Sequence, residues 1–281
     1  MINKKDIEAR NQTNPEPLEV TKTRALITDT FKDLEFIEET HQYFVGEDEL
    51  PPVSTVCHGF QPYVDWDSIA ENKAAKLGIP VETLKEDWHK KNITSTSCGS
   101  KTHWFGEQMM NLFIGREVQL PFQYTSDGYM IPYAPKEKAI EAYWESILSN
   151  PRVYPVMPEA KIYLREIEGI KIMKPYAGTF DILMAYKMGD GRIAYSIHDY
   201  KSNVDLKNDF NRFKGNHLLE PFTDLIDEPL SIYSIQLSLY QLGLQQLGLE
   251  IVDRNLIWLK EDGTFDKVPV PDLTERLLKT L

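Results

Sequence analysis

Residues 176–201 read YAGTFDILMAYKMGDGRIAYSIHDYK, two strand-like runs separated by a tight turn. Both runs are rich in residues that favour β-strands, and the Gly-Asp-Gly sequence at 189–191 is typical of a hairpin turn. Position 190, the centre of that turn, is also the midpoint between 181 and 199. If the strands pair symmetrically about it, Asp181 faces Asp199 across the ladder, with Cβ atoms about 4.5–5.5 Å apart. A slip of one residue in this register would send Asp181 to the other face.

Lys201 lies two residues after Asp199, so it shares the face of that carboxylate about 6.6 Å further along the strand. Two facing carboxylates repel each other, and a cation between them relieves the repulsion. Mg²⁺ is typically held by one or two carboxylates together with phosphate oxygens, and it activates a bound water. A lysine beside the metal can orient or deprotonate that water and balance charge on the phosphate. The pattern therefore predicts hydrolysis of phosphodiester bonds.

The remaining chain predicts an α/β fold, because helical periodicity dominates before residue 150 and strand-like runs follow it. A stripe of apolar residues on 136–148 indicates a buried core helix. A polar stretch from 202 to 229 separates the hairpin from an apolar helix. The expected helices are 68–78, 81–92, 94–115, 136–148, 231–248 and 273–281, and the expected strands are two within 41–56, then 160–167, 176–186, 192–201 and 255–260.

Two segments are expected to lie outside regular structure. Residues 1–35 are polar and contain Pro15 and Pro17, so they are expected to form a flexible leader. Residues 127–135 look like a turn-rich connector. We expect 36–281 to form one domain, with a hairpin and a helical region at its beginning.

Composition sets further limits on function. The 281 residues are 42% apolar, which suits a globular core, and no apolar run approaches the roughly 20 residues that span a membrane. Two cysteines are too few for a disulfide framework or a four-cysteine iron–sulfur cluster, and they favour a reducing cytoplasm. The net charge of −12 opposes general binding to nucleic acids, although a local basic groove and bound metal ions can offset it.

Four short motifs resemble those of the RecB-like branch of the PD-(D/E)XK nuclease superfamily. Gly99-Ser-Lys-Thr-His103 looks like its GxxxH motif, and GTFD (178–181) with HDYK (198–201) look like its GxxD and DxK motifs. QLSLY (236–240) looks like its QxxxY motif. The motifs occur in family order, and the resemblance covers roughly residues 40 to 270. Segments at 41–56 and 75–88 are similar to the leading region of phage-type exonucleases in this branch.

The resemblance implies a restriction-endonuclease-like core, a central mixed sheet flanked by helices. It implies a Mg²⁺- or Mn²⁺-dependent nuclease acting on DNA, as an exonuclease, in phage or prophage recombination or DNA processing. The enzyme would then work in the cytoplasm, of the host if phage-encoded, with a recombination or single-strand-binding protein as partner. Carried onto this sequence, catalysis is assigned to Asp181, Asp199, Lys201 and His103, metal binding to His103, Asp181, Asp199 and the Tyr200 carbonyl, and nucleic-acid contact to Gln236 and Tyr240.

Each candidate also has a structural interpretation. Lys201 could be a plain ion-pair partner of Asp199, and His103 a structural histidine. Glu159 could be an extra ligand or a solvated position at a strand edge, with the latter favoured. Lys207, Arg212 and Lys214 could bind phosphates or simply lie in a solvated loop. The alternative to an enzyme is a catalytically silent member of the fold that binds nucleic acid or a protein, or an acidic protein whose surface mimics DNA.

Overall fold

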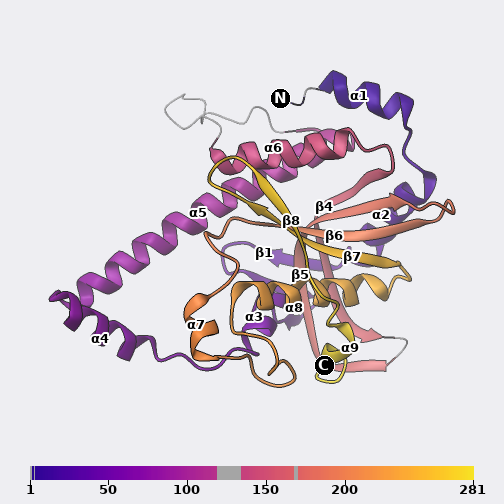
Figure 1. The fold of residues 1–281 in the computed structure, drawn as a ribbon. Coiled ribbons are helices and arrows are strands. Elements are labelled where there is room, and N and C mark those ends of the chain that lie inside the picture. The colour runs from indigo at the N-terminus through magenta and orange to yellow at the C-terminus, as the bar shows by residue number, and fades with distance from the viewer. Residues whose placement is uncertain (1, 3, 119–133, 168–169) are drawn as a thin grey trace.

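The structure, a computed structural model, describes residues 2, 4–118, 134–167 and 170–281 (Figure 1). Most of the connector expected at 127–135 lies outside these residues. At the centre is a five-stranded sheet in which β6 and β7 are parallel and the other neighbours antiparallel. The expected α/β class with a mixed sheet flanked by helices is confirmed. In spatial order the strands are β4 (Val153–Ile167), β5 (Ile170–Lys187), β6 (Ile193–Lys201), β7 (Ile251–Leu259) and β8 (Phe265–Pro269).

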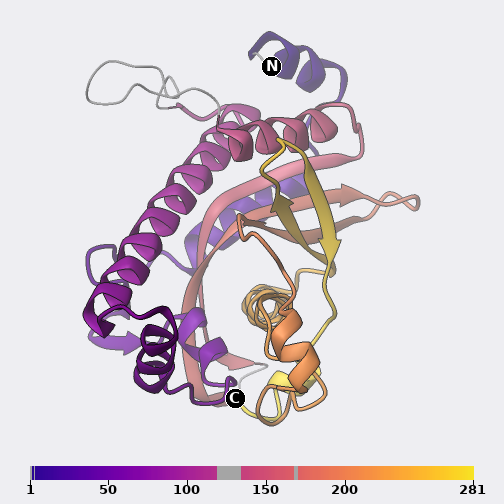
Figure 2. The same cartoon turned by 60° about the vertical axis from the view of Figure 1, so that its left-hand side comes forward.

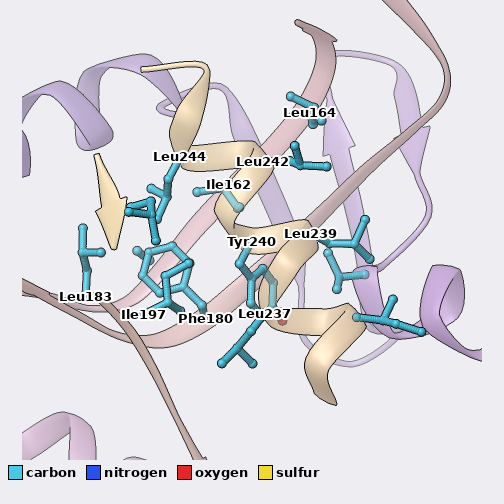
Figure 3. Packing of buried hydrophobic residues seen from close by; sticks show 14 of the residues in the cluster. Ile162, Leu164, Phe180, Leu183, Ile197, Leu237, Leu239, Tyr240, Leu242 and Leu244 are labelled. Carbon is cyan, nitrogen blue, oxygen red and sulfur yellow. The ribbon is translucent and has the colours of Figure 1, made fainter. Parts of the chain in front are cut away.

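Helix α8 (Pro229–Gln245) covers one face of the sheet and belongs to the crossover between the parallel strands β6 and β7. Parallel neighbours require such a crossover, because a tight turn cannot join them. The apolar side chains of α8 interlock with Ile162, Phe180 and Ile197 of the sheet (Figure 3). A Cβ at Gly243 would lie 2.3 Å from Ile162 Cδ1, so the glycine lets α8 approach β4 closely. Figure 2 looks nearly along α8 and shows the long strands curving around it.

Helices α5 (Val81–Phe113) and α6 (Pro135–Leu148) cover the other face. The stripe expected on 136–148 is confirmed, since Tyr143 and Trp144 are almost completely buried there. They pack with Met109 of α5 and with side chains from β5, β6 and β7. The sheet is therefore covered on both faces.

Helix α5 corrects one expectation, because it is a single helix of 33 residues where two were expected. Hydroxyl side chains near residue 94 looked like caps of a new helix. Instead, Thr94 Oγ1 donates to the Lys90 carbonyl at 2.9 Å, and Thr102 Oγ1 donates to Cys98 at 2.8 Å. These bonds back to the preceding turn let serine and threonine continue a helix. The first half of α5 and α4 (Trp66–Leu77) project from the body in Figure 1.

The flexible leader expected at 1–35 is also corrected, because within it α1 (Lys4–Thr13) and α2 (Leu18–Thr30) pack on the body. Val20 and Ile27 of α2 belong to the same core cluster as the apolar side chains of α8. Thr23 Oγ1 lies 2.6 Å from the Tyr195 hydroxyl. Spacings of three and four residues place these side chains on one face of a helix. The polar composition concealed that narrow buried stripe.

Smaller elements complete the fold. The hairpin expected within 41–56 is present as β2 (Gln42–Val45) and β3 (Asp48–Leu50), joined to β1 (Leu34–Ile37). No helix within the described ranges is long and apolar enough to cross a membrane. Three short elements were not predicted: α3 (Val53–His58), α7 (Asp209–Lys214) and β8. The helix expected at 273–281 is present but shorter, as α9 (Thr274–Leu277).

Candidate metal centre and its surroundings

The hairpin register is as predicted. Ile182 pairs with His198, and each later pair down to Lys187 and Ile193 keeps the same symmetry about position 190. Asp181 and Asp199 lie directly beyond the Ile182–His198 pair, at the open end of the hairpin. Both carboxylates are buried, with 8% of Asp181 and 2% of Asp199 exposed.

Asp181 is held from two sides. Its Oδ2 accepts a hydrogen bond of 2.6 Å from the Tyr200 backbone N–H, which ties β5 to β6. Its Oδ1 lies 3.0 Å from His103 Nδ1 on α5. The regular alternation of β5 shifts here, because Phe180 and Leu183, three residues apart, both pack under α8. Asp181 lies at this shift and so reaches the histidine of the opposite layer.

Glu159 of β4 joins this pair. The pairs on either side of it, Pro158 with Ile182 and Ala160 with Phe180, place it opposite Asp181. Ligand atoms of His103, Glu159 and Asp181 all lie within 4.8 Å of one another. Glu159 also has a positive φ of 45°, which is uncommon for a residue other than glycine. Of the two interpretations of Glu159, the structure supports a place beside the other ligands rather than a solvated edge.

The donor set of this triad fits a divalent cation. One imidazole nitrogen and carboxylate oxygens within 4.8 Å are ligands that such ions accept. Asp199 is not part of the triad, although its charge is felt by His103 and Glu159. Its buried Oδ2 makes no hydrogen bond of good geometry among the described residues. The same oxygen lies 2.5 Å from the Lys201 ammonium, so Asp199 is ion-paired and not free.

The electrostatics show an excess of negative charge. Burial, and then the Asp181 carboxylate, raise the pKa of Asp199 to about 6. The same two causes raise the pKa of Glu159 well above its usual range. Burial opposes the charge on His103 and on Asp181, but their mutual attraction prevails: the pKa of His103 rises to about 9 and that of Asp181 falls. A bound cation would relieve the remaining repulsion.

Lys201 is surrounded by groups that hold its ammonium in place. It lies 2.5 Å from Asp199 Oδ2 and donates to Gln236 Oε1 of α8 at 3.2 Å. The ammonium also lies 4.2 Å from the ring centroid of Tyr233. Burial opposes its charge, but the Asp199 carboxylate raises the pKa of Lys201 overall. The ion pair with Asp199 is therefore present, and it lies within the candidate site.

Gln236 and Tyr240 share one face of α8, as predicted, with Gln236 Nε2 donating to the Tyr240 hydroxyl at 3.1 Å. The glycine of the GTFD motif, Gly178, is required by close packing next to Tyr240. A Cβ at Gly178 would lie 2.9 Å from the Tyr240 ring and 2.8 Å from Val53. Gly178 thus allows α8 and α3 to approach the strand beside the site.

His198 and Tyr200 point to the opposite layer, as the alternation of β6 predicts. His198 Nδ1 lies 2.7 Å from the Tyr143 hydroxyl. Trp144 Nε1 donates to the Tyr200 hydroxyl at 2.8 Å. A Cβ at Gly106 of α5 would lie 2.3 Å from the Tyr200 ring. The role predicted for Tyr200 concerns its backbone carbonyl and stays a prediction.

The three basic residues after the hairpin are not brought to the triad in the described contacts. Arg212 Nε donates to Glu228 Oε2 at 2.7 Å, so its guanidinium is already paired. Lys207 and Lys214 are exposed. Lys214 lies 5.7 Å over the ring of its neighbour Phe213. Their predicted contact with nucleic acid stays a prediction.

Two residues of the site were undervalued or missed. Glu159 could not be placed by counting from the turn, because the β4–β5 ladder shifts its register between Leu164 and Glu166. Tyr233 lies three residues before Gln236, on the same helical face, and that spacing was a usable signal. Comparison with known proteins adds no assignment: no protein-family model matches the chain, and no curated protein matches it.

Proposed function

We propose that the chain is a Mg²⁺- or Mn²⁺-dependent deoxyribonuclease of the RecB-like branch of the PD-(D/E)XK superfamily, with a restriction-endonuclease-like core. One observation carries the proposal. His103, Glu159 and Asp181, from α5, β4 and β5, converge within 4.8 Å at the hairpin end that carries Asp199 and Lys201. Exonuclease action and a role in phage DNA recombination or processing are the parts of the proposal that rest on the sequence motifs.

His103, Glu159 and Asp181 would hold the cation, with the Asp199 carboxylate, which is also paired with Lys201, as a further donor. A divalent cation bound there supplies a water of lowered pKa and neutralises charge on the phosphate. The protein itself fixes the donors in advance: the Tyr200 N–H orients Asp181, and the shift in β5 turns it toward His103. Preorganisation of this kind avoids reorganisation during the reaction.

Lys201 would act as a fixed positive charge. Its raised pKa keeps the ammonium protonated near neutral pH, so it donates hydrogen bonds to the phosphate or to the attacking water. Asp199 and Gln236 hold it on one side, and the Tyr233 ring lies under it. Removing the ammonium leaves Asp199 buried and without its partner, which raises the negative charge facing the substrate.

The test is cleavage of end-labelled linear DNA and closed circular DNA in Mg²⁺, Mn²⁺ or EDTA, comparing the wild type with Lys201→Ala. We expect metal-dependent loss of linear DNA, reduced at least about a hundredfold by the substitution. Survival of the circle identifies an exonuclease. A folded wild type that cuts neither DNA under any metal, or a variant that cuts equally well, refutes the proposal and leaves the silent DNA- or protein-binding interpretation.

A further inference from the structure

A large pocket lies directly beside Lys201. It has a volume of about 980 Å³ and is lined by the segment between α3 and α4, by α7 and by the start of α8. Lys201 and Gln236 form its inner wall. A second pocket of about 340 Å³, lined by Glu159 and Tyr240, shares Ser54 and Gln236 with the first. The two pockets thus adjoin each other next to the candidate site.

Exposed aromatic rings border the larger pocket. Tyr63 is 91% exposed, Trp66 65% and Phe210 64%. The described contacts of Tyr63 and Phe210 include no hydrogen bond or stacked ring that explains this exposure. Tyr233 contributes a further ring at the inner wall. Large exposed apolar side chains that gather at one pocket mark a binding site.

The charges of this pocket do not suit the backbone of a duplex. Among the described residues that line it, Lys201 is the one lysine or arginine. Its two acids are already satisfied: Glu228 is paired with Arg212, and Asp227 Oδ1 accepts from Gln61 Nε2 at 2.7 Å. Duplex binding depends on many cations that neutralise phosphates, whereas single strands bind by stacking their bases on aromatic rings.

We propose that this pocket receives the unpaired end of a DNA strand, with bases stacked on Tyr63 and Phe210 and the adjoining phosphate delivered to Lys201. The occupant follows from the walls, which are aromatic, and from the continuity with Lys201 and Gln236. This inference rests on the proposed nuclease function and specifies its substrate class. The net charge of −12 opposes the binding of DNA through its phosphates. Stacking of bases on the rings provides affinity that does not depend on positive charge.

The experiment measures binding without cleavage. Fluorescence anisotropy in EDTA follows a labelled single strand of about 12 nucleotides, a blunt duplex of the same sequence, and an abasic strand of the same length. The proteins are the wild type, the double variant Tyr63→Ala/Phe210→Ala, and Phe213→Ala. Phe213 is the matched control, because it is 84% exposed on the same helix α7 but does not line the pocket.

We expect the double variant to bind the single strand at least about tenfold more weakly, since each stacked base contributes measurably to affinity. Its binding of duplex and the binding of single strand by Phe213→Ala should stay within about twofold of wild type, and the abasic strand should bind the wild type as weakly as the double variant binds the normal strand. Equal binding of the single strand by wild type and double variant, equal binding of abasic and normal strands, or no binding by the wild type overturns the inference.

Because the measurement is made in EDTA, it separates the pocket from the catalysis. A wild type that stacks DNA in this way but never cleaves it keeps the pocket and refutes the proposed nuclease. A nuclease whose single-strand binding ignores both rings refutes the pocket and keeps the enzyme.

Discussion

The two ends of the β5–β6 hairpin carry the same kinds of charged groups in opposite surroundings. At the closed end, Asp190 pairs with Arg192 at 2.7 Å and Arg192 pairs with Glu250 at 2.6 Å, all on the surface. At the open end, Asp181 and Asp199 are buried, and the Lys201 side chain is only 12% exposed. Surface pairs are screened by water, whereas buried charges feel one another strongly.

This contrast shows which charges are available for chemistry. The closed-end groups satisfy one another locally, and Asp190 also accepts from the Arg192 backbone as a turn residue. At the open end, three carboxylates face one imidazole and one ammonium, and burial holds the pKa of Asp199 and Glu159 above their usual ranges. Such displaced pKa values cluster at functional sites.

The largest effect should come from replacing an aspartate by asparagine at each end of the hairpin in turn. We expect Asp181→Asn to slow metal-dependent DNA cleavage on the order of a hundredfold or more, because it removes a ligand charge and the partner of His103. Asp190→Asn at the closed end should keep a rate within about twofold, since an amide oxygen can still serve the turn. Initial rates of nucleotide release measure both, and a similar loss in the two variants would break the comparison.

A smaller effect tests how firmly the packing holds the open end. Gly106→Ala places a Cβ 2.3 Å from the Tyr200 ring, and that ring is anchored by Trp144. We expect a loss of about 1–3 kcal/mol in the free energy of unfolding by denaturant. Gly99→Ala, on the same helix, meets its nearest atom at 4.0 Å. It should be neutral or stabilising by up to about 1 kcal/mol, and equal losses in both would show that no close approach exists at Gly106.

The smallest effect concerns the excess of negative charge. In EDTA at neutral pH, Glu159→Gln should raise the free energy of unfolding by roughly 0.2–1 kcal/mol, because it removes an acid whose ionisation is opposed by burial and by Asp181. The folded pKa of Glu159 is raised by burial and Asp181, so its cost is absent below the unfolded pKa of about 4.3 and grows as pH rises above it. The advantage of the variant should therefore appear only above that pH.

With Mn²⁺ the wild type should become more stable than Glu159→Gln. The wild type should gain thermal stability from the ion, while Glu159→Gln should gain less, since a ligand that binds only the folded state stabilises it. Glu250→Gln at the closed end is the control, and it should respond to Mn²⁺ as the wild type does. A Mn²⁺-dependent rise in melting temperature that is equal in all three proteins would remove Glu159 from the metal centre.

Local patterns predicted much of this molecule correctly. The hairpin register, the helical face shared by Gln236 and Tyr240, and the buried stripe of 136–148 all follow from side-chain periods of 2 and 3.6 residues. Errors occurred where a weak local signal was overridden by packing. The polar residues before 35 form helices on the core, and the hydroxyls near 94 continue α5 instead of capping a helix.

The sequence by itself determined that Asp181, Asp199 and Lys201 gather at one end of a hairpin, because a tight turn fixes which positions lie across a strand pair. The direction of the Asp181 side chain, in contrast, depends on the shift in the alternation of β5. Only the tertiary structure decided that Glu159 and His103 join them. Glu159 depends on a register shift in β4–β5 between Leu164 and Glu166, and His103 depends on how α5 crosses the sheet. The pocket beside Lys201 depends on the approach of α3, α7 and α8. Those placements result from packing between segments far apart in the chain, which no local spacing encodes.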